Sequence, residues 1–448
     1  MKHFILISKE WNEKVIPKLK VFKVIDPSSY FTGFNGNSKP QLLELIRLSN
    51  RFGWYSYSVK TSDRLVVPPD LYDAVSSYYV IETMPLSRES LEYTTKFKNL
   101  EKVKILLRYG DTRSPSDKQM EYRGSTFSKS FNDLKTSSVN LKCKLSYSSS
   151  YNEKLSDGEI TTIFYSNVFS SIYLDGLTLN VNKRMPQIPQ NSLVKIVLWT
   201  VSMSQWDFDM ILQCSQQHLK FLELNYFTVL DCDGDYDLKQ LSTASHSMNL
   251  DRLFIRTNYR KPSGIIYFLN QIKCKNLKFS FRHVTTESDT SSFTIENSHI
   301  EEFDFQNQKI TENVRMSLDL WKSKTTLKKI KLIDTNLTIE YCKELFNLNS
   351  LEYRGDQLDI LLNLNLPKLT DIIVQQQPRV EDIHSIIGNR YLQSIHLTEV
   401  NFNDFLKLLN TEHPSIRLMR FDKVDWDNIT VEVPLMKESI KENKNNTK

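Results

Sequence analysis

The sequence predicts an α/β fold: a solenoid of stacked repeats, with parallel strands along its concave face and helices along its convex face. The first observation is a triplet of apolar residues. Two residues separate its first and second members, and one residue separates its second and third. The second is the regular return of that pattern, and the third is the helical spacing of apolar residues between its copies. A chain of 448 residues is also long for one compact domain, as expected for an elongated array.

The apolar triplet recurs from about residue 169 to residue 421, with middle members 21 to 31 residues apart. Its last two members are two residues apart, so both side chains point to one face of a short strand. We expect these middle members to align on neighbouring parallel strands: Ile172, Ile196, Leu222, Leu253, Leu277, Phe303, Ile330, Leu351, Ile372, Ile395 and Met419. The first third is less regular: Tyr78 and Val103 stand at comparable positions there, and Phe22 could.

Helices are expected between the strands, because apolar residues in these segments fall on one helical side. The segments 338–346, 380–387 and 401–409 show this spacing, and Thr338 stands where an N-cap would. Residues 148–153 are rich in serine and are expected to form a loop. One strand and one helix cannot bury their apolar faces alone, so stacking of the repeats must supply the core.

A period of 20 to 29 residues with this triplet resembles the leucine-rich-repeat superfamily. The Asn that follows the strand in that family is poorly matched here, for example by Asp334 or Val400. We divide the chain into an N-terminal segment (1–19), degenerate repeats with insertions (20–160), a leucine-rich-repeat-like solenoid (161–434) and a disordered tail (435–448).

The first nineteen residues resemble the second half of an F-box, in which an apolar pair, a small residue and a basic residue precede Trp and another apolar helix. The resemblance implies binding to the Skp1 adaptor of a cullin ubiquitin ligase, through Leu6, Ile7, Trp11 and Val15. The opening segment of the family, Leu-Pro with the first helix, does not precede this motif. A functional F-box, a remnant of one and a helix that caps the solenoid therefore remain as alternatives.

Composition favours a folded protein over a disordered one. The excess of Lys and Arg over Asp and Glu is only 58 − 53 = 5, which disfavours a nucleic-acid partner. No apolar run approaches the ~20 residues of a membrane span, so a cytoplasmic or nuclear protein is expected. The five cysteines lie far apart and predict buried thiols.

We expect no enzyme, no cofactor and no metal. The 11 glycines show none of the spacings of phosphate-binding loops or nucleophile elbows, and no His pair has a zinc spacing. The acidic stretch Asp231–Asp237 lacks the register of a calcium-binding EF-hand and is expected to be a solvated loop.

The partner is expected on the concave face, formed by the residue after each middle member and the one two further on. These pairs are Val197/Trp199, Glu223/Asn225, Phe254/Arg256, Lys278/Ser280, Asp304/Gln306, Lys331/Ile333, Glu352/Arg354, Ile373/Gln375 and His396/Thr398. Aromatic and Arg side chains usually dominate such interfaces. The binding residues are therefore expected to be Trp199, Phe254, Arg256, Lys331, Arg354 and His396. Two functions fit: the substrate receptor of an F-box ubiquitin ligase, or a repeat adaptor unconnected to ubiquitination.

Overall fold

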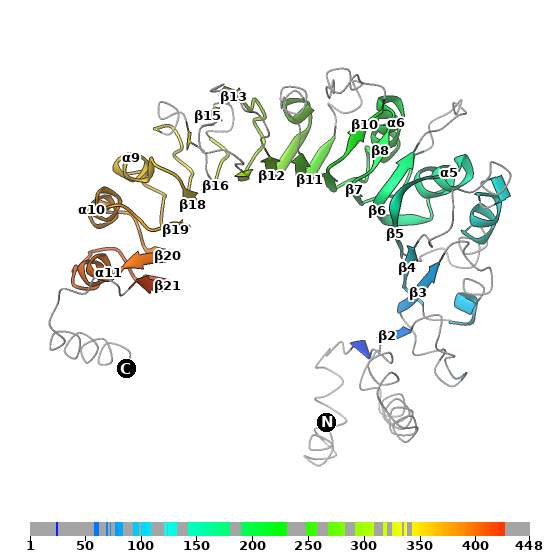
Figure 1. Ribbon diagram of the computed structural model, residues 1–448, viewed down its shortest axis with the longest axis horizontal. Helices are drawn as coiled ribbons and strands as arrows, with labels where there is room; N and C mark the ends of the chain where they lie inside the picture. The colour runs from blue at the N-terminus through cyan, green and yellow to red at the C-terminus, as the bar shows by residue number, and fades with distance from the viewer. Residues whose placement is uncertain are drawn as a thin grey trace, which may run out of the picture. The chain divides into compact units, whose positions relative to one another are not determined.

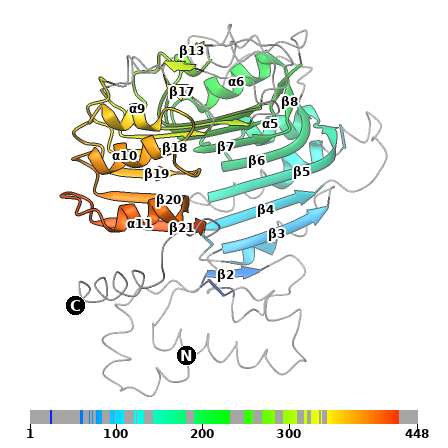
Figure 2. The same cartoon turned by 60° about the vertical axis from the view of Figure 1, so that its left-hand side comes forward.

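The computed structural model describes part of the chain. The described residues are 24–25, 58–61, 69, 72, 77–83, 93–97, 100–108, 121–122, 124–131, 142–179, 190–230, 248–257, 268–282, 292–308, 317–319, 325–333, 336–337 and 343–425. The chain divides into two compact units, Met1–Asp231 (unit 1) and Cys232–Lys448 (unit 2). Each unit is α/β, with a sheet of parallel strands (Figures 1 and 2). The division falls at residue 231, whereas 160 lies inside unit 1.

The main sheet of unit 1 pairs its strands in chain order, every pair parallel. Its strands are β1 (Val24–Ile25), β2 (Ser58–Thr61), β3 (Ser77–Thr83), β4 (Lys102–Arg108), β5 (Lys142–Lys154), β6 (Phe169–Leu179), β7 (Lys195–Trp199) and β9 (Phe221–Asn225). The short strands β8 (Ser202–Met203) and β10 (Thr228–Val229) continue the pairing from the end of β6. The connections contain η4 (Tyr93–Lys96), α5 (Asp157–Tyr165) and α6 (Gln205–Ser215).

The main sheet of unit 2 is also parallel and in chain order. It contains β11 (Asn249–Thr257), β12 (Lys273–Arg282), β14 (Glu302–Gln308), β16 (Lys329–Ile333), β18 (Ser350–Arg354), β19 (Asp371–Val374), β20 (Ser394–Asn401) and β21 (Leu418–Asp425). A smaller parallel sheet consists of β13 (Ser292–Thr294), β15 (Ser317–Asp319) and β17 (Asn336–Leu337). The helices α9 (Leu358–Asn363), α10 (Val380–Gly388) and α11 (Phe402–Leu409) follow β18, β19 and β20.

The predicted alignment of the triplets is confirmed within each unit. In unit 2, Leu277 lies opposite Phe303 and Phe303 opposite Ile330, and the alignment continues strand by strand to Met419. In unit 1, Ile172, Ile196 and Leu222 align in the same way. All of these side chains except Met419 are buried, because each strand turns its apolar face to the core.

The rows in the N-terminal part of unit 1 are displaced from those of the triplets that follow. Tyr78 and Val103 align with each other, and their row continues to Cys143 and Phe169. Ile172 instead follows the row of Leu145, two residues further along. The triplets of the first third are therefore displaced by two residues from the others, a shift that preserves the buried face because side chains alternate with a period of two.

Residues 148–153 lie within β5, so the expected loop is wrong. The strand continues because it stays paired with β6 on both sides of an irregularity between Ser148 and Glu153. Gly176 of β6 has φ +63° and approaches Ser149 so closely that a Cβ would stand 2.0 Å from the Ser149 carbonyl oxygen. Only glycine permits both the positive φ and this close approach.

Two of the three expected helices are present. Helix α10 covers residues 380–388, and α11 begins after Asn401, whose side chain accepts a hydrogen bond from the Asp404 amide at 2.8 Å. The third expectation is wrong over residues 343–346, which form turns, and residues 338–342 lie outside the described part.

Buried asparagines connect successive turns of the chain. Asn389 donates from Nδ2 to the carbonyl of Leu362 at 2.9 Å and accepts from the Tyr391 amide at 3.0 Å. Asn191 makes the same kind of bridge to Phe164 and Leu193. Each therefore satisfies backbone groups of two turns in the core, where an unpaired group would be costly.

The thiols of Cys143, Cys214 and Cys274 are buried and free, as predicted. Burial raises the pKa of each to about 12, so at neutral pH all three are protonated. Cys232 and Cys342 lie outside the described residues.

Candidate functional site

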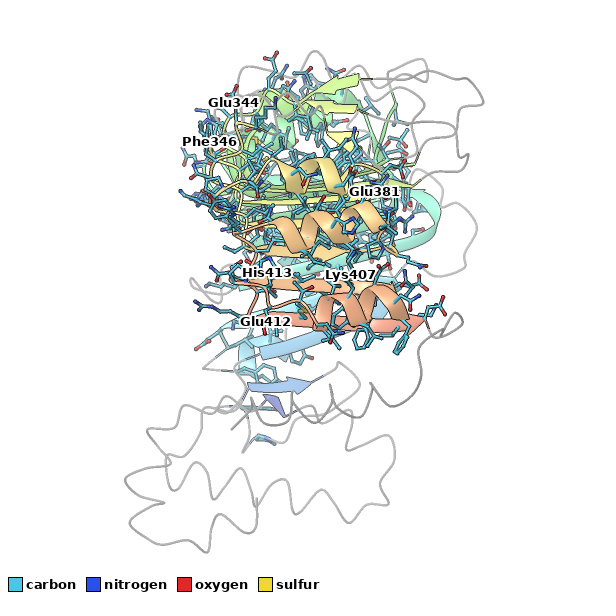
Figure 3. All side chains as sticks on the ribbon, turned by 90° about the vertical axis from the view of Figure 1, so that its left-hand side faces the viewer. Glu344, Phe346, Glu381, Lys407, Glu412 and His413 are labelled. Atoms are coloured by element: carbon cyan, nitrogen blue, oxygen red, sulfur yellow. The ribbon has the colours of Figure 1, made fainter. Side chains whose placement is uncertain are left out.

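The candidate site is the face of the unit 2 sheet opposite α9, α10 and α11, which we call the strand face of unit 2. Figures 1 and 3 show these helices along the other side of the strands. Along each strand, buried side chains alternate with half-buried or exposed ones, as in β16, where Ile330 and Leu332 are buried and Lys331 and Ile333 are not. The second set forms the strand face.

One residue from each strand of this sheet lies in a transverse line, which we call the central row. Every member is opposite the next in the parallel register. The row runs Phe254, Lys278, Asp304, Lys331, Glu352, Ile373, His396 and Arg420. It brings together Phe254, Lys331 and His396, three of the residues proposed from the sequence.

A second row lies two residues further along the strands. It contains Arg256, Ser280, Gln306, Ile333 and Arg354, again in direct register. Arg256 and Arg354 therefore lie in one line beside the central row. Arg354 is exposed and Arg256 is half-buried. Five of the six predicted binding residues thus share one face of unit 2.

The first part of the central row is a chain of neighbouring contacts. The ammonium of Lys278 lies 5.2 Å from the centre of the Phe254 ring and 3.2 Å from Asp304 Oδ2. Asp304 also accepts a hydrogen bond from Gln306 Nε2 at 3.0 Å. These contacts hold the side chains in place before any partner binds, which lowers the entropy that binding must overcome.

The middle of the row is a second ion pair. Lys331 Nζ lies 2.5 Å from Glu352 Oε1, and the two side chains are 27% and 20% exposed. The same oxygen of Glu352 accepts a hydrogen bond from Gln375 of the loop after β19. Partial burial reduces the screening of this pair by water and salt.

The last part of the row centres on Asp422, which the sequence reasoning did not single out. Asp422 accepts from His396 Nε2 at 2.8 Å and from Arg420 Nε at 3.1 Å. The hydrogen bond from His396 is the main reason that the pKa of Asp422 is lowered, and Arg420 acts in the same direction. The triplet Ile416/Met419/Phe421 predicts the positions of Arg420 and Asp422 on this face, because they follow Met419 by one and three positions.

Three residues expected on this type of face are buried instead. Ser280 of unit 2 and Val197 and Asn225 of unit 1 are at most 4% exposed. Small or short side chains at these positions are covered by their larger neighbours, so they cannot contact a partner. Trp199 is half-buried on β7, in register with Asp175 and Asn225, and belongs to unit 1.

The proposed adaptor-binding residues Leu6, Ile7, Trp11 and Val15 lie outside the described residues, as do the acidic stretch 231–237 and the tail 435–448. Within the described residues, no group of three His, Cys, Asp or Glu side chains is placed to hold a metal ion. The arrangement on the strand face is suited to non-covalent recognition by an aromatic ring, guanidinium groups and paired charges.

Comparison with known proteins finds no matching family model and no matching curated protein. In the described part of the chain, no helix is long and apolar enough to cross a membrane.

Proposed function

We propose that this chain is a protein-binding repeat scaffold, built as a leucine-rich-repeat-like solenoid, and that the strand face of unit 2 holds the partner. The observation that carries the proposal is the central row, in which every strand from β11 to β21 contributes one side chain to one line. Repeat proteins present extended surfaces of this kind to their partners.

The chemistry of the row favours a protein over a polyanion. Basic and acidic side chains alternate through Lys278, Asp304, Lys331 and Glu352, so a phosphate backbone would meet a carboxylate at every second strand. Phe254 and Arg354 at the ends of this stretch are of the residue types that most often dominate protein interfaces.

Photo-crosslinking tests this placement directly. A photoreactive amino acid introduced at position 331, on the strand face, is expected to form a crosslink to the partner in cells that express the full chain. The same amino acid at position 381, on α10, is the control and is expected to form none (Figure 3). Crosslinking from 381 but not from 331 would place the partner on the helices and refute the proposal.

We further propose that the chain acts as a substrate receptor of an F-box ubiquitin ligase, with Leu6, Ile7, Trp11 and Val15 directed to Skp1. The support is the apolar-basic-Trp sequence of the first nineteen residues. The alternative is a repeat adaptor with no connection to ubiquitination, which would use the same strand face.

Co-purification with Skp1 distinguishes these two roles. The receptor role predicts that the tagged chain recovers Skp1 and that Trp11→Ala abolishes the recovery. Trp206→Ala is the matched control, because Trp206 is an exposed tryptophan of α6, 37% accessible. If Skp1 is not recovered, or is lost equally with both variants, the adaptor role stands and the receptor role does not.

A further inference from the structure

On the sheet of unit 1, lysines lie directly opposite lysines. Lys102 of β4 is in register with Lys142 of β5, and Lys104 with Lys144. These lysines alternate with Val103, Ile105 and Cys143, Leu145, which are at most 2% exposed, so the lysines occupy the opposite face. We call this the strand face of unit 1.

The line of lysines extends beyond β5. Lys144 is opposite Ser171 of β6, and Ser171 is opposite Lys195 of β7. Lys195 Nζ lies 4.2 Å from the centre of the Phe221 ring on β9, the next strand. Five cations therefore occupy the starts of β4, β5 and β7, and we call them the basic patch: Lys102, Lys104, Lys142, Lys144 and Lys195.

The basic patch contrasts with the sheet of unit 2. There, the register sets lysines against acids: Lys278 against Asp304, Lys329 against Glu302, and Lys331 against Glu352. In the part of unit 1 that the structure describes, no ion pair includes Lys102, Lys142 or Lys144. Like charges directly opposite each other on neighbouring strands destabilise a sheet. Folding alone would favour an acid at one of these positions.

Apolar and acidic side chains lie next to the basic patch, further along the same strands. The row two residues on contains Leu106 and Tyr173, both half-buried. Glu223 of β9 belongs to this same row, and Asp175 of β6 lies in the row beyond it, together with Arg108 of β4. Along the strand direction the face thus changes from a basic row to a row that is partly apolar and partly acidic.

We propose that the basic patch binds an acidic segment of a partner protein, one whose carboxylates alternate with apolar side chains. The inference rests on the protein-binding role proposed above and adds a second surface with a defined partner chemistry. Adjacent strands are about 4.8 Å apart, so one carboxylate can contact the lysines of two strands at once. Such a contact would remove the repulsion between Lys102 and Lys142 and would make binding depend strongly on salt.

The neighbouring rows select the peptide over a nucleic acid. Apolar side chains of the segment can cover Leu106 and Tyr173, which a phosphate backbone cannot do. Asp175 and Glu223 would repel a polyanion that crossed the whole face, whereas a short acidic segment over the strand starts avoids them. Charge complementarity therefore identifies the partner as an acidic, partly apolar protein segment.

The test uses the full chain and a fluorescent peptide of twelve residues in which Glu and Leu alternate, followed by anisotropy at low and physiological salt. The variant K102E/K142E/K144E is expected to weaken binding at least tenfold. The matched control K273E/K343E/K368E makes the same change in net charge at exposed lysines of unit 2 and is expected to change binding less than twofold. Equal loss in both variants, or no binding by the unaltered chain, would overturn the inference.

Two further measurements separate the site from a general effect of charge or folding. A single-stranded DNA of twelve nucleotides should bind at least tenfold more weakly than the peptide, and equal or tighter binding of the DNA would overturn the inference. The single change Lys142→Glu places an acid opposite Lys102, so it should raise the melting temperature at low salt while weakening peptide binding. A higher melting temperature with unchanged peptide binding would contradict the proposed site. If the chain does not bind the peptide but position 331 still crosslinks to a partner, this inference is wrong and the proposed partner binding by unit 2 is unaffected.

Discussion

Lys331 and Glu352 face each other across β16 and β18, with Nζ 2.5 Å from Oε1 and both side chains more than two-thirds buried. This pair differs from Lys328–Glu301, at 2.8 Å, whose side chains are 54% and 37% exposed. Water and salt screen the second pair more than the first. A double-mutant cycle with alanine should therefore give a coupling of about 1 kcal/mol for Lys331–Glu352 and less than about 0.3 kcal/mol for Lys328–Glu301. Equal couplings from urea unfolding would show that the position on the strand face does not strengthen the ion pair.

Ile330→Asp should unfold the strands around β16. Ile330 is 2% exposed in the apolar core of unit 2, so the new carboxylate would be buried without a partner. We expect a loss of more than about 3 kcal/mol in the free energy of unfolding. Ile333→Asp, on the other face of the same strand, is the control and should cost much less. If the two variants unfold at the same urea concentration, the assignment of the two faces is wrong.

Asn389→Ala should destabilise unit 2 although it removes only a small polar group. The alanine leaves the Leu362 carbonyl and the Tyr391 amide without their partner in a region where Asn389 is 1% exposed. The expected cost is about 2 kcal/mol, measured by chemical unfolding. Asn363→Ala, at an exposed position of α9, should leave the stability within about 0.5 kcal/mol of the unaltered chain.

Asp422→Asn should lower the melting temperature at neutral pH but not in strong acid. The His396 hydrogen bond lowers the pKa of the Asp422 carboxyl below its ordinary value of 3.8. A group whose pKa is lower in the folded state stabilises that state above its unfolded pKa, and the effect is lost as the pH falls through the folded pKa. The melting temperatures of the two proteins should therefore differ at pH 5 to 7 and converge as the pH falls below the lowered pKa of Asp422. A difference that persists unchanged in acid would mean that the carboxylate charge is not its cause.

The register of unit 2 could be predicted from the sequence because one apolar triplet per repeat leaves a single alignment that buries every strand. A slip of one residue would expose Leu277 and Phe303 and bury their charged neighbours. The predicted line of Phe254, Lys331 and His396 follows from this alone. The same pattern also marks Arg420, one position after Met419, although the concave-face pairs predicted from the sequence end at His396 and Thr398.

Other features could not be predicted because they depend on contacts between distant segments. Residues 148–153 carry loop-forming serines, yet pairing with β6 resumes at Glu153 after an irregularity at which Gly176 closely approaches Ser149. The sequence 338–346 has helical spacing, but its described residues, 343–346, form turns before β18. The role of Asn389 depends on the Leu362 carbonyl, 27 residues away, and no local pattern marks it.

The affinity for the protein that crosslinks to position 331 tests the central proposal most directly. The proposal predicts that Phe254→Ala with Arg354→Ala weakens binding by more than about 1 kcal/mol for each side chain, because both lie on the strand face of unit 2. The comparison variant is Glu381→Lys with Lys407→Glu, which exchanges two exposed charges on α10 and α11 without changing the net charge (Figure 3). It should bind as the unaltered chain does. If the exchange on the helices abolishes binding and the strand-face variant binds normally, the partner is held on the helices and the proposal is wrong.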